Sequence, residues 1–200
     1  MHARRGAIAA QCIAALAGAR RGALRWNDPV HWSRAMARLT RIVPCLWFDH
    51  QAEEAARYYA DIFDNSRVGA ISRYGETGKE VHGRAPGSVM TVQFELDGTP
   101  FTALNGGPAF QFSPAISLQV SCATQEEIDH YWERLGAGGD PRAQQCGWLA
   151  DQYGLSWQIV PAMVAEWMTG DPAGVQRAMA ALLGMKKLDI AALRRAYDGA

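Results

Sequence analysis

The segment IVPCLWFDHQAEEAARYYADIF, residues 42–63, decides the fold because a version of it returns later in the chain. Its pairs Glu53-Glu54 and Tyr58-Tyr59 recur as Glu126-Glu127 and Tyr131-Trp132, at a constant spacing of 73 residues. In both copies an apolar run with strand character precedes a segment with helical periodicity. Two copies of a strand–helix unit indicate a duplicated fold, and duplicated folds often hold their ligand between the halves.

Both helical segments carry their bulky apolar residues on one side, at the i, i+3, i+4 and i+7 spacing of a helix that packs on a sheet. The stripes are Ala52, Ala55, Ala56, Tyr59 and Phe63 in the first copy, and Ile128, Tyr131, Trp132 and Leu135 in the second. Asp49 is predicted to cap the first helix, and Glu53-Glu54 lie in its first turn, where the helix dipole favours acids.

The first module, residues 42–107, is predicted to contain four strands. After the helix, Arg67–Tyr74 is expected to be a strand, and Gly75–Gly87, rich in glycine and proline, a loop. The clearest strand covers residues 90–96, where apolar and polar residues alternate as in a half-buried strand. A tight turn then leads into a strand at residues 99–104.

The second module, residues 115–160, repeats this order with a shorter middle. It is predicted to contain a strand at 115–121, a helix at 125–135, and a hairpin of strands at 144–150 and 155–160. Measured from the hairpin glycines, Thr102 corresponds to Gln158. Residues 162–200 are predicted to form a helical appendage, with Asp171 and Asp189 as N-caps. Its apolar face could cover the sheet of this chain or of a partner.

Residues 1–40 differ from the rest of the chain, with seven arginines against one acid, Asp28. A secretory signal, a transit peptide and a segment outside the working protein all remain open, and a poorly ordered extension is the favoured interpretation.

The bulk composition excludes several classes of protein. The hydrophobic content of 48% and charged content of 20% are those of a soluble globular domain. We expect no membrane segment, because no apolar run approaches the roughly 20 residues that a spanning helix needs. We expect no nucleic-acid partner, because residues 41–200 are mildly acidic. The four cysteines lie far apart without a C-x-x-C pair, which favours reduced thiols in a cytoplasmic protein.

Five segments resemble one known family. They are PCLWFDHQAEEAARYYADIFDNS, SRYGE, GSVMTVQFELDGTPFTALNGGPAFQF, CGWLADQYGLSWQIVP and MKKLDIAAL. Over about residues 41–195 they resemble the PhnB-like branch of the vicinal oxygen chelate superfamily (glyoxalase, bleomycin resistance and dioxygenase proteins), a branch often labelled 3-demethylubiquinone-9 3-methyltransferase. The resemblance implies an α+β fold in which residues 41–161 form two β-α-β-β-β modules, each an incomplete barrel, that enclose a cavity. It also implies a homodimer.

Enzymes of that superfamily usually bind a divalent metal through one residue from each of four strands. Carried over singly, these positions fall at Ile42 (or Pro44), Thr102, Ala115 and Gln158. Only Gln158 could be a ligand, and one neutral amide would hold a dication weakly, so we expect no metal and no other cofactor. A methyl-donor nucleoside is not expected either, because the glycine-rich run 136–140 follows a helix instead of a strand.

Candidate ligand-binding residues lie on the expected cavity face of the strands. Ser117 and Gln119 share one face of their strand, and Gln158 lies on a strand of the same pattern, which suits a polar or neutral ligand. The alternatives are that these residues are solvated and that the tryptophans belong to the core. The candidate set is Trp47, Thr102, Asn105, Ser117, Gln119, Trp148 and Gln158.

No catalytic residue can be named from the sequence. The histidines, including His82 in the glycine-rich loop, have no partner at a spacing that would make a metal or nucleophile site, and His82 is expected at the surface. We therefore expect a metal-free protein that binds a small organic molecule, with any reaction left open. The alternatives are a metal-dependent lyase or dioxygenase, the quinone methyltransferase of the label, and a drug-sequestering protein that uses Trp132, Trp148 and Trp157.

Overall fold

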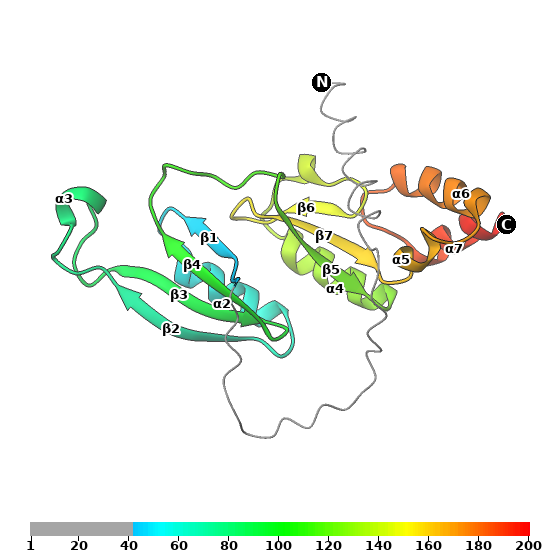
Figure 1. Cartoon of the computed structure of the whole chain (residues 1–200). Helices are drawn as coiled ribbons and strands as arrows, with labels where there is room; N and C mark the ends of the chain where they lie inside the picture. Colours follow the sequence, from blue (N-terminus) through cyan, green and yellow to red (C-terminus); the bar gives the residue numbers. More distant parts are fainter. Residues whose placement is uncertain (1–41) are drawn as a thin grey trace, which may run out of the picture. The chain divides into compact units, whose positions relative to one another are not determined.

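The computed structural model describes residues 42–200, so the predicted N-terminal extension lies outside the described residues. The described chain divides into two compact units (Figure 1). The N-terminal unit comprises residues 42–116 with the short segment 152–155, and the C-terminal unit comprises residues 117–151 and 156–200. None of the helices formed by residues 42–200 is long and apolar enough to cross a membrane.

The N-terminal unit has the predicted order of one helix and four strands. Its elements are β1 (Cys45–Phe48), α2 (Ala52–Ile62), β2 (Arg67–Arg73), α3 (Lys79–His82), β3 (Val89–Leu96) and β4 (Thr99–Asn105). The strands form one open sheet in the order β1-β4-β3-β2, in which β1 is parallel to β4 and the other pairs are antiparallel. The short helix α3 is a difference, because the sequence predicts only a loop there.

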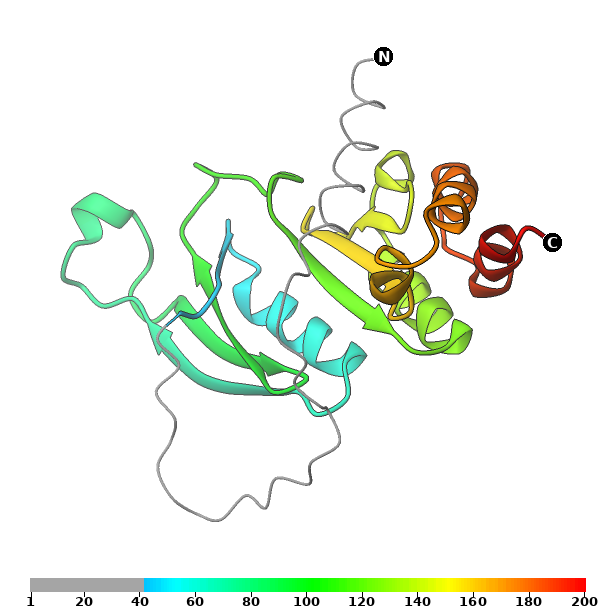
Figure 2. The same ribbon diagram turned by 45° about the vertical axis from the view of Figure 1, so that its right-hand side comes forward.

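Helix α2 lies along one face of this sheet in both ribbon views (Figures 1 and 2). Ala52, Ala55, Ala56 and Tyr59 of the predicted stripe are fully buried, as are Val92 and Ala103 on the facing strands. Alanines allow the helix backbone to approach the sheet, and the Tyr59 ring stacks on Phe94 at 6.3 Å between centroids. Burial of this apolar face stabilises the unit at about 25 cal/mol for each Å² removed from water.

The segment 152–155 is held by the aromatic residues of the N-terminal unit. The Tyr153 ring lies edge-on to Phe48 and Tyr58, with centroids 5.9 and 5.8 Å away. Its hydroxyl donates a hydrogen bond of 2.9 Å to Glu54 on α2. This contact explains why the hairpin tip belongs to the N-terminal unit although its strands belong to the other unit.

The predicted N-cap of α2 is wrong. The cap position is Gln51, without a side-chain bond, and Asp49 instead forms an ion pair with Arg84 at 3.3 Å. The cap comes from β4: Asn105 Oδ1 accepts a hydrogen bond of 2.8 Å from the backbone N–H of Ala52. Because β1 and β4 are parallel, the end of β4 lies beside the start of the helix that follows β1.

The C-terminal unit contains a smaller sheet and most of the helices. Its elements are β5 (Ser117–Cys122), α4 (Gln125–Gly136), the 3-10 helix η1 (Pro141–Ala143), β6 (Trp148–Ala150), β7 (Ser156–Pro161), α5 (Val164–Trp167), α6 (Pro172–Leu183) and α7 (Ile190–Asp198). The sheet order is β5-β7-β6, with β5 parallel to β7. Asp171 and Asp189 cap α6 and α7 as predicted, each accepting a backbone hydrogen bond of 2.8 Å.

The second module differs from the expected β-α-β-β-β order, because the described residues form three strands in place of four. Nothing corresponds to β2. The chain leaves α4, passes the backbone carbonyl of Ala150 so closely at Gly139 that a side chain there would collide with it, and turns through η1 directly into the β6–β7 hairpin. The sheet therefore stays open and narrow.

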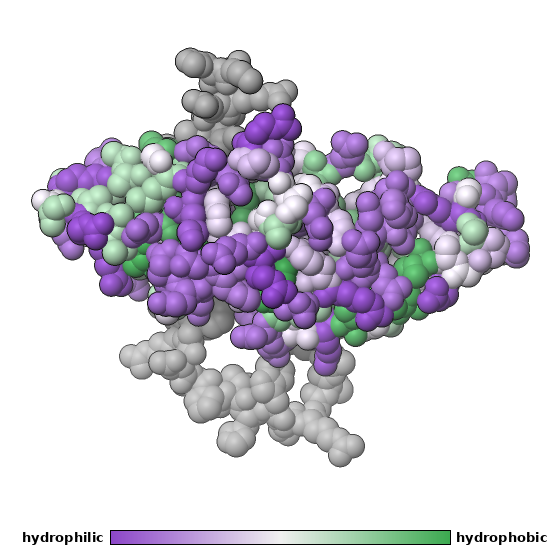
Figure 3. Space-filling model, turned by 180° about the vertical axis from the view of Figure 1, so that it is seen from behind, coloured by the Kyte–Doolittle hydropathy of each residue, from purple (hydrophilic) through white to green (hydrophobic). Residues whose placement is uncertain are grey.

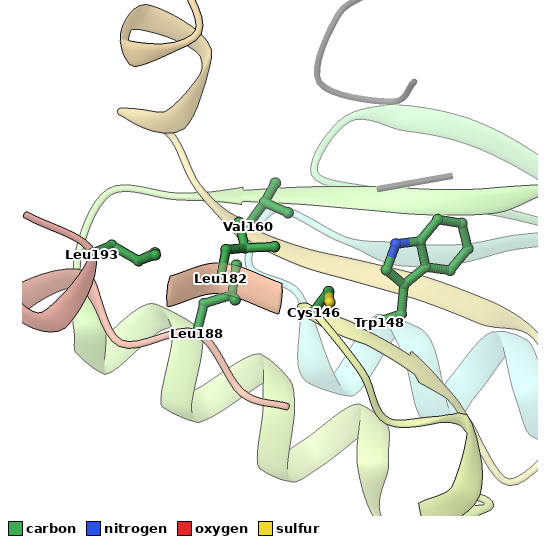
Figure 4. Close-up of a cluster of buried hydrophobic side chains, with 6 residues drawn as sticks. All are labelled: Cys146, Trp148, Val160, Leu182, Leu188 and Leu193. Carbon is green, nitrogen blue, oxygen red and sulfur yellow. The ribbon is translucent and has the colours of Figure 1, made fainter. Parts of the chain in front are cut away.

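The C-terminal helices pack against one end of the sheet of their own chain. A cluster of buried side chains joins the two (Figure 4), namely Cys146, Trp148, Val160, Leu182, Leu188 and Leu193. Backbone bonds add to it, since the N–H groups of Cys146 and Gly147 donate to the carbonyls of Met185 and Lys186 at 2.8 and 2.7 Å. Seen from behind, the surface is mostly hydrophilic, with pale green residues over α6 and α7 and separate, deeper green patches elsewhere on this face (Figure 3).

Candidate functional site

One row of side chains crosses all three strands of the C-terminal sheet. The parallel register places Gln119 of β5 opposite Gln158 of β7, and the antiparallel register places Trp148 of β6 on the other side of Gln158. Residues paired in register point to the same face of a sheet, so two amides and an indole lie side by side. The sequence predicted these residues as candidates, and the strand pairing brings all three together.

Gln158 is the buried member of this row. It is 8% exposed, and its amide nitrogen donates a hydrogen bond of 2.7 Å to the hydroxyl oxygen of Ser117. Ser117 is half-buried and Gln119 is exposed, so the row opens toward β5. Among the described residues, no group donates a hydrogen bond to the side-chain oxygen of Gln158, and no fully buried side-chain polar atom lacks a partner. The oxygen is therefore reachable by solvent.

A small cavity lies beside Gln158. Its volume of about 10 Å³ is close to the space that one water molecule needs. Gln158 is the polar side chain among the residues that line it, which are Cys146, Trp148, Gln158, Val160, Val164, Leu182 and Leu188. The C-terminal helices thus close the apolar end of the row and leave the end at Ser117 and Gln119 open. A neighbouring cavity of about 20 Å³ between α5, α6 and α7 has an apolar lining.

The opposite face of the same sheet is core. Leu149, Trp157 and Ile159 are buried, with Ile128 and Leu135 of α4. The indole N–H of Trp157 donates a hydrogen bond of 2.8 Å to Asp151, a carboxylate that is only 2% exposed. Sequence reasoning missed this pair, because nothing in the segment signals that the acid turns inward. Of the three tryptophans suggested for drug sequestration, Trp157 is therefore a core residue.

The N-terminal sheet carries the equivalent positions on the face away from α2. Cys45, Thr102 and Gln93 form a row across β1, β4 and β3. Thr102 is half-buried and Cys45 is exposed, and partial burial raises the pKa of the Cys45 thiol above its usual value. The thiol is therefore protonated at neutral pH, so this row offers a hydroxyl, a thiol and an amide.

Two further candidates in the N-terminal unit have structural partners. Trp47 donates its indole N–H to the carbonyl of Gly107 at 2.8 Å, and Phe110 packs edge-on against its ring at 5.0 Å. Asn105 is 7% exposed, and besides capping α2 it donates a hydrogen bond of 3.1 Å to the carbonyl of Val89. Its side chain serves the helix side of the sheet, away from the row formed by Thr102.

Two of the positions carried over as metal ligands do not lie on a strand of the structure. Ile42 and Ala115 lie outside the strands. The residues paired with Thr102 and Gln158 are instead Cys45 and Gln119.

These residues do not fit a divalent metal. A hydroxyl, a protonated thiol and two amides supply no carboxylate and no imidazole, whereas protein metal sites use several such donors in a fixed geometry. Within residues 42–200, no three His, Cys, Asp or Glu side chains gather in a way that could hold a metal ion.

The glycine-rich run 136–140 does not fit a methyl-donor nucleoside. It follows α4, and its glycine at 139 is needed for the close approach to Ala150. Asp140 accepts a hydrogen bond of 2.9 Å from the N–H of Arg142 and so caps η1. The run therefore serves a local turn, whereas a nucleotide loop would join a strand to a helix.

His82 has neighbours that the sequence did not reveal. Its ring lies 4.5 Å from the ring of Tyr74, and its Nδ1 accepts a hydrogen bond of 3.0 Å from the backbone N–H of Arg84. Arg84 in turn donates a hydrogen bond of 2.9 Å to the carbonyl of Asp49, which ties the α3 segment to the end of β1. His82 is half-buried. These contacts indicate a structural role for His82 and Arg84, which hold the α3 segment against the end of β1.

Comparisons with known proteins agree with this architecture. The family model described as 3-demethylubiquinone-9 3-methyltransferase matches residues 40–160. No curated protein matches the chain. A solved structure of a PhnB protein from Bacillus cereus is similar, with 37% sequence identity, a TM-score of 0.52, and coverage of 61% of this chain and 99% of that chain.

Two further structures are more distant. A protein from Pseudomonas aeruginosa has 18% identity and a TM-score of 0.47, covering 60% of this chain and 96% of its own. The fosfomycin resistance protein FosX of Listeria monocytogenes has 18% identity and a TM-score of 0.35, covering 62% of this chain and 91% of its own. The chain belongs to the PhnB-like family labelled 3-demethylubiquinone-9 3-methyltransferase.

Proposed function

We propose that the chain binds a small organic molecule, without a metal, on the polar face of its C-terminal sheet. The observation that carries the proposal is Gln158, an amide that is 8% exposed and whose side-chain oxygen accepts no hydrogen bond from the described residues. The oxygen is reachable by solvent and lies beside an indole, so it can accept a hydrogen bond from a ligand or an ordered water. Ser117 holds the amide in place, and Gln119 extends the polar surface to solvent.

The donor chemistry of the paired positions supports the metal-free part of the proposal. Amide and hydroxyl groups orient an organic ligand by hydrogen bonds, but they bind a dication poorly unless carboxylates accompany them. The name of the matched family suggests methyl transfer, and no arrangement among the described residues supports that reaction. The proposal is therefore binding, with no bond made or broken. The homodimer and the cytoplasmic location remain predictions.

A thermal-shift screen of the full chain tests the proposal, together with elemental analysis of protein purified without chelator. We expect no stoichiometric metal and no rise in melting temperature with Mn²⁺, Ni²⁺ or Zn²⁺. We expect some organic compounds to raise the melting temperature, because a ligand at 100 times its Kd stabilises the folded state by about 2.7 kcal/mol. A stoichiometric metal would overturn the proposal.

Two variants locate the binding. Gln158→Met keeps the length of the side chain and removes both amide groups, so it should abolish the ligand-induced shift. Gln176→Met makes the same change at an exposed position of α6 and should leave the shift intact. Gln119→Ala, also exposed, should weaken binding without affecting folding. Equal shifts in all three variants would place the ligand elsewhere.

A further inference from the structure

We infer that the ligand of this site is neutral and presents a hydroxyl or N–H group to Gln158, and this inference rests on the proposed function. Three observations carry it: the absence of charge around the row, the direction of the hydrogen bond that Gln158 already makes, and the size of the adjoining cavity. None of them depends on what related proteins bind.

The first observation is charge. None of the side chains that line the cavity is charged, and neither are Gln119, Gln158 and Trp148 of the row or the paired residues Ser117 and Ser156 beside it. An anion placed against the buried amide of Gln158 and an indole would lose its hydration without gaining a counter-charge, and a cation would do the same. Carboxylate, phosphate and phosphonate ligands are therefore disfavoured relative to neutral ones.

The second observation is the polarity of Gln158. One N–H of its amide nitrogen donates to Ser117 at 2.7 Å, and its oxygen accepts no hydrogen bond from the described residues. An acceptor requires a donor, so a ligand with an O–H or N–H group satisfies this oxygen. A ligand that offers only acceptors, such as an ether, would leave the oxygen of Gln158 unpaired.

The third observation is space. The cavity beside Gln158 holds about 10 Å³, which admits one water-sized group and no ring. The ligand therefore inserts only its donor group, in place of a water, between Gln158 and Trp148. Its body lies over the open end of the row at Ser117 and Gln119. Leu182 and Leu188 of the C-terminal segment form the far wall and set this depth.

Three small aromatic probes test the inference by NMR titration of the full, ¹⁵N-labelled chain. Phenol and anisole have nearly the same shape and differ in the donor proton, and phenylphosphonate has the same ring with an anionic group. We expect phenol to shift the Gln158 side-chain amide and the Trp148 indole signals. Anisole should bind at least about fivefold more weakly, the worth of one neutral hydrogen bond, and phenylphosphonate should leave these signals unchanged.

Ser117→Ala provides a second test that does not remove Gln158. Without the Ser117 hydroxyl, both N–H groups of the Gln158 amide are free to donate, so anisole should gain affinity relative to phenol. Gln176→Met is the matched control and should keep the wild-type preference. In Gln158→Met the preference for phenol should disappear.

The outcomes separate the two proposals. If anisole or phenylphosphonate binds at these signals as well as phenol, the neutral-donor class is overturned and binding at the site stands. If none of the probes, and none of the compounds found in the thermal-shift screen, moves the Gln158 and Trp148 signals, the proposed function itself is overturned.

Discussion

The two modules of this chain share one sequence pattern, but the N-termini of their helices are capped in different ways. In the N-terminal module Asn105 reaches from β4 to cap α2, with Oδ1 2.8 Å from the N–H of Ala52. In the C-terminal module the cap of α4 is local, since Thr124 accepts a hydrogen bond of 3.3 Å from the N–H of Glu127. The carboxylate of Glu127 in turn accepts a hydrogen bond of 2.6 Å from the N–H of Ala123, as in a capping box.

The polar faces of the two sheets also differ. In the N-terminal unit the row of Cys45, Thr102 and Gln93 lies on the side of the sheet away from α2. In the C-terminal unit Leu182 and Leu188 cover one end of the matching row and bury Gln158. The C-terminal module has one strand fewer and is followed by helices, and its polar row contains a buried amide, Gln158. The difference teaches that the burial of this row depends on the appendage as well as on the duplicated module.

The largest effect should come from breaking the attachment of that appendage. Leu188 is 1% exposed in the cluster of Figure 4, so Leu188→Ala should lower the free energy of unfolding by about 2–5 kcal/mol. Leu183→Ala is the control, because Leu183 is 36% exposed and its truncation should cost less than about 1 kcal/mol. Urea denaturation of both variants measures the difference. Equal costs would mean that the cluster does not hold the helices.

Removing the helix caps should lower the free energy of unfolding by an intermediate amount, and the cap of α2 should matter more than the cap of α4. Asn105→Ala leaves the N–H of Ala52 and the carbonyl of Val89 without their partner, and each unsatisfied buried group costs about 1–3 kcal/mol, so we expect a loss of about 3 kcal/mol. Thr124→Ala should cost about 1 kcal/mol, as is usual for an exposed N-cap.

The same urea measurement compares the two caps. Asn105→Asp keeps the acceptor for Ala52 and loses the donor to Val89, so its cost should fall between the two alanine variants. If Thr124→Ala lowered the free energy of unfolding as much as Asn105→Ala, the idea that the remote cap contributes more to stability would be contradicted.

The smallest effect concerns an ion pair beside the appendage. Lys187 lies 2.6 Å from Asp129 on α4, and its hydrogen bond, together with one from Gln125, lowers the pKa of the Asp129 carboxyl. A lowered pKa in the folded state stabilises it above the ordinary value near 3.9, and this contribution disappears as the pH falls through the folded-state pKa. Both side chains are more than a third exposed, so solvent screens the pair and its worth stays below about 1 kcal/mol.

Asp129→Asn should therefore be slightly less stable than the parent chain at pH 7, and the difference should shrink as the pH falls below the ordinary carboxyl pKa. Urea midpoints collected over this pH range give the comparison. A stability gap that widened on acidification would have the wrong sign for this pair. Gln125 also binds Leu188 and Ile190 through the backbone, at 3.1 and 2.9 Å, and its bonds should hold the appendage in the variant.

Much of the candidate site could be read from the alternation of residues along single strands. Ser117, Gln119 and Gln158 were identifiable because polar and apolar residues alternate on β5 and β7, and alternation assigns faces. Ile42 and Ala115 were misplaced as ligand positions because alternation says nothing about which residues pair across strands. The partners Cys45 and Gln119 follow from the parallel register, which involves residues far apart in the chain.

The sequence by itself determined the local elements of this protein: the duplicated strand–helix pattern, the amphipathic stripe of α2, the alternating strand β3, and the N-caps Asp171 and Asp189. Each depends on neighbours within a few residues, where periodicity and capping chemistry act. Only the tertiary structure decided that Asn105 caps α2 in place of Asp49, that Gln119 pairs with Gln158, and that the C-terminal helices bury Gln158. These outcomes depend on contacts between distant segments, whose energies no local pattern records.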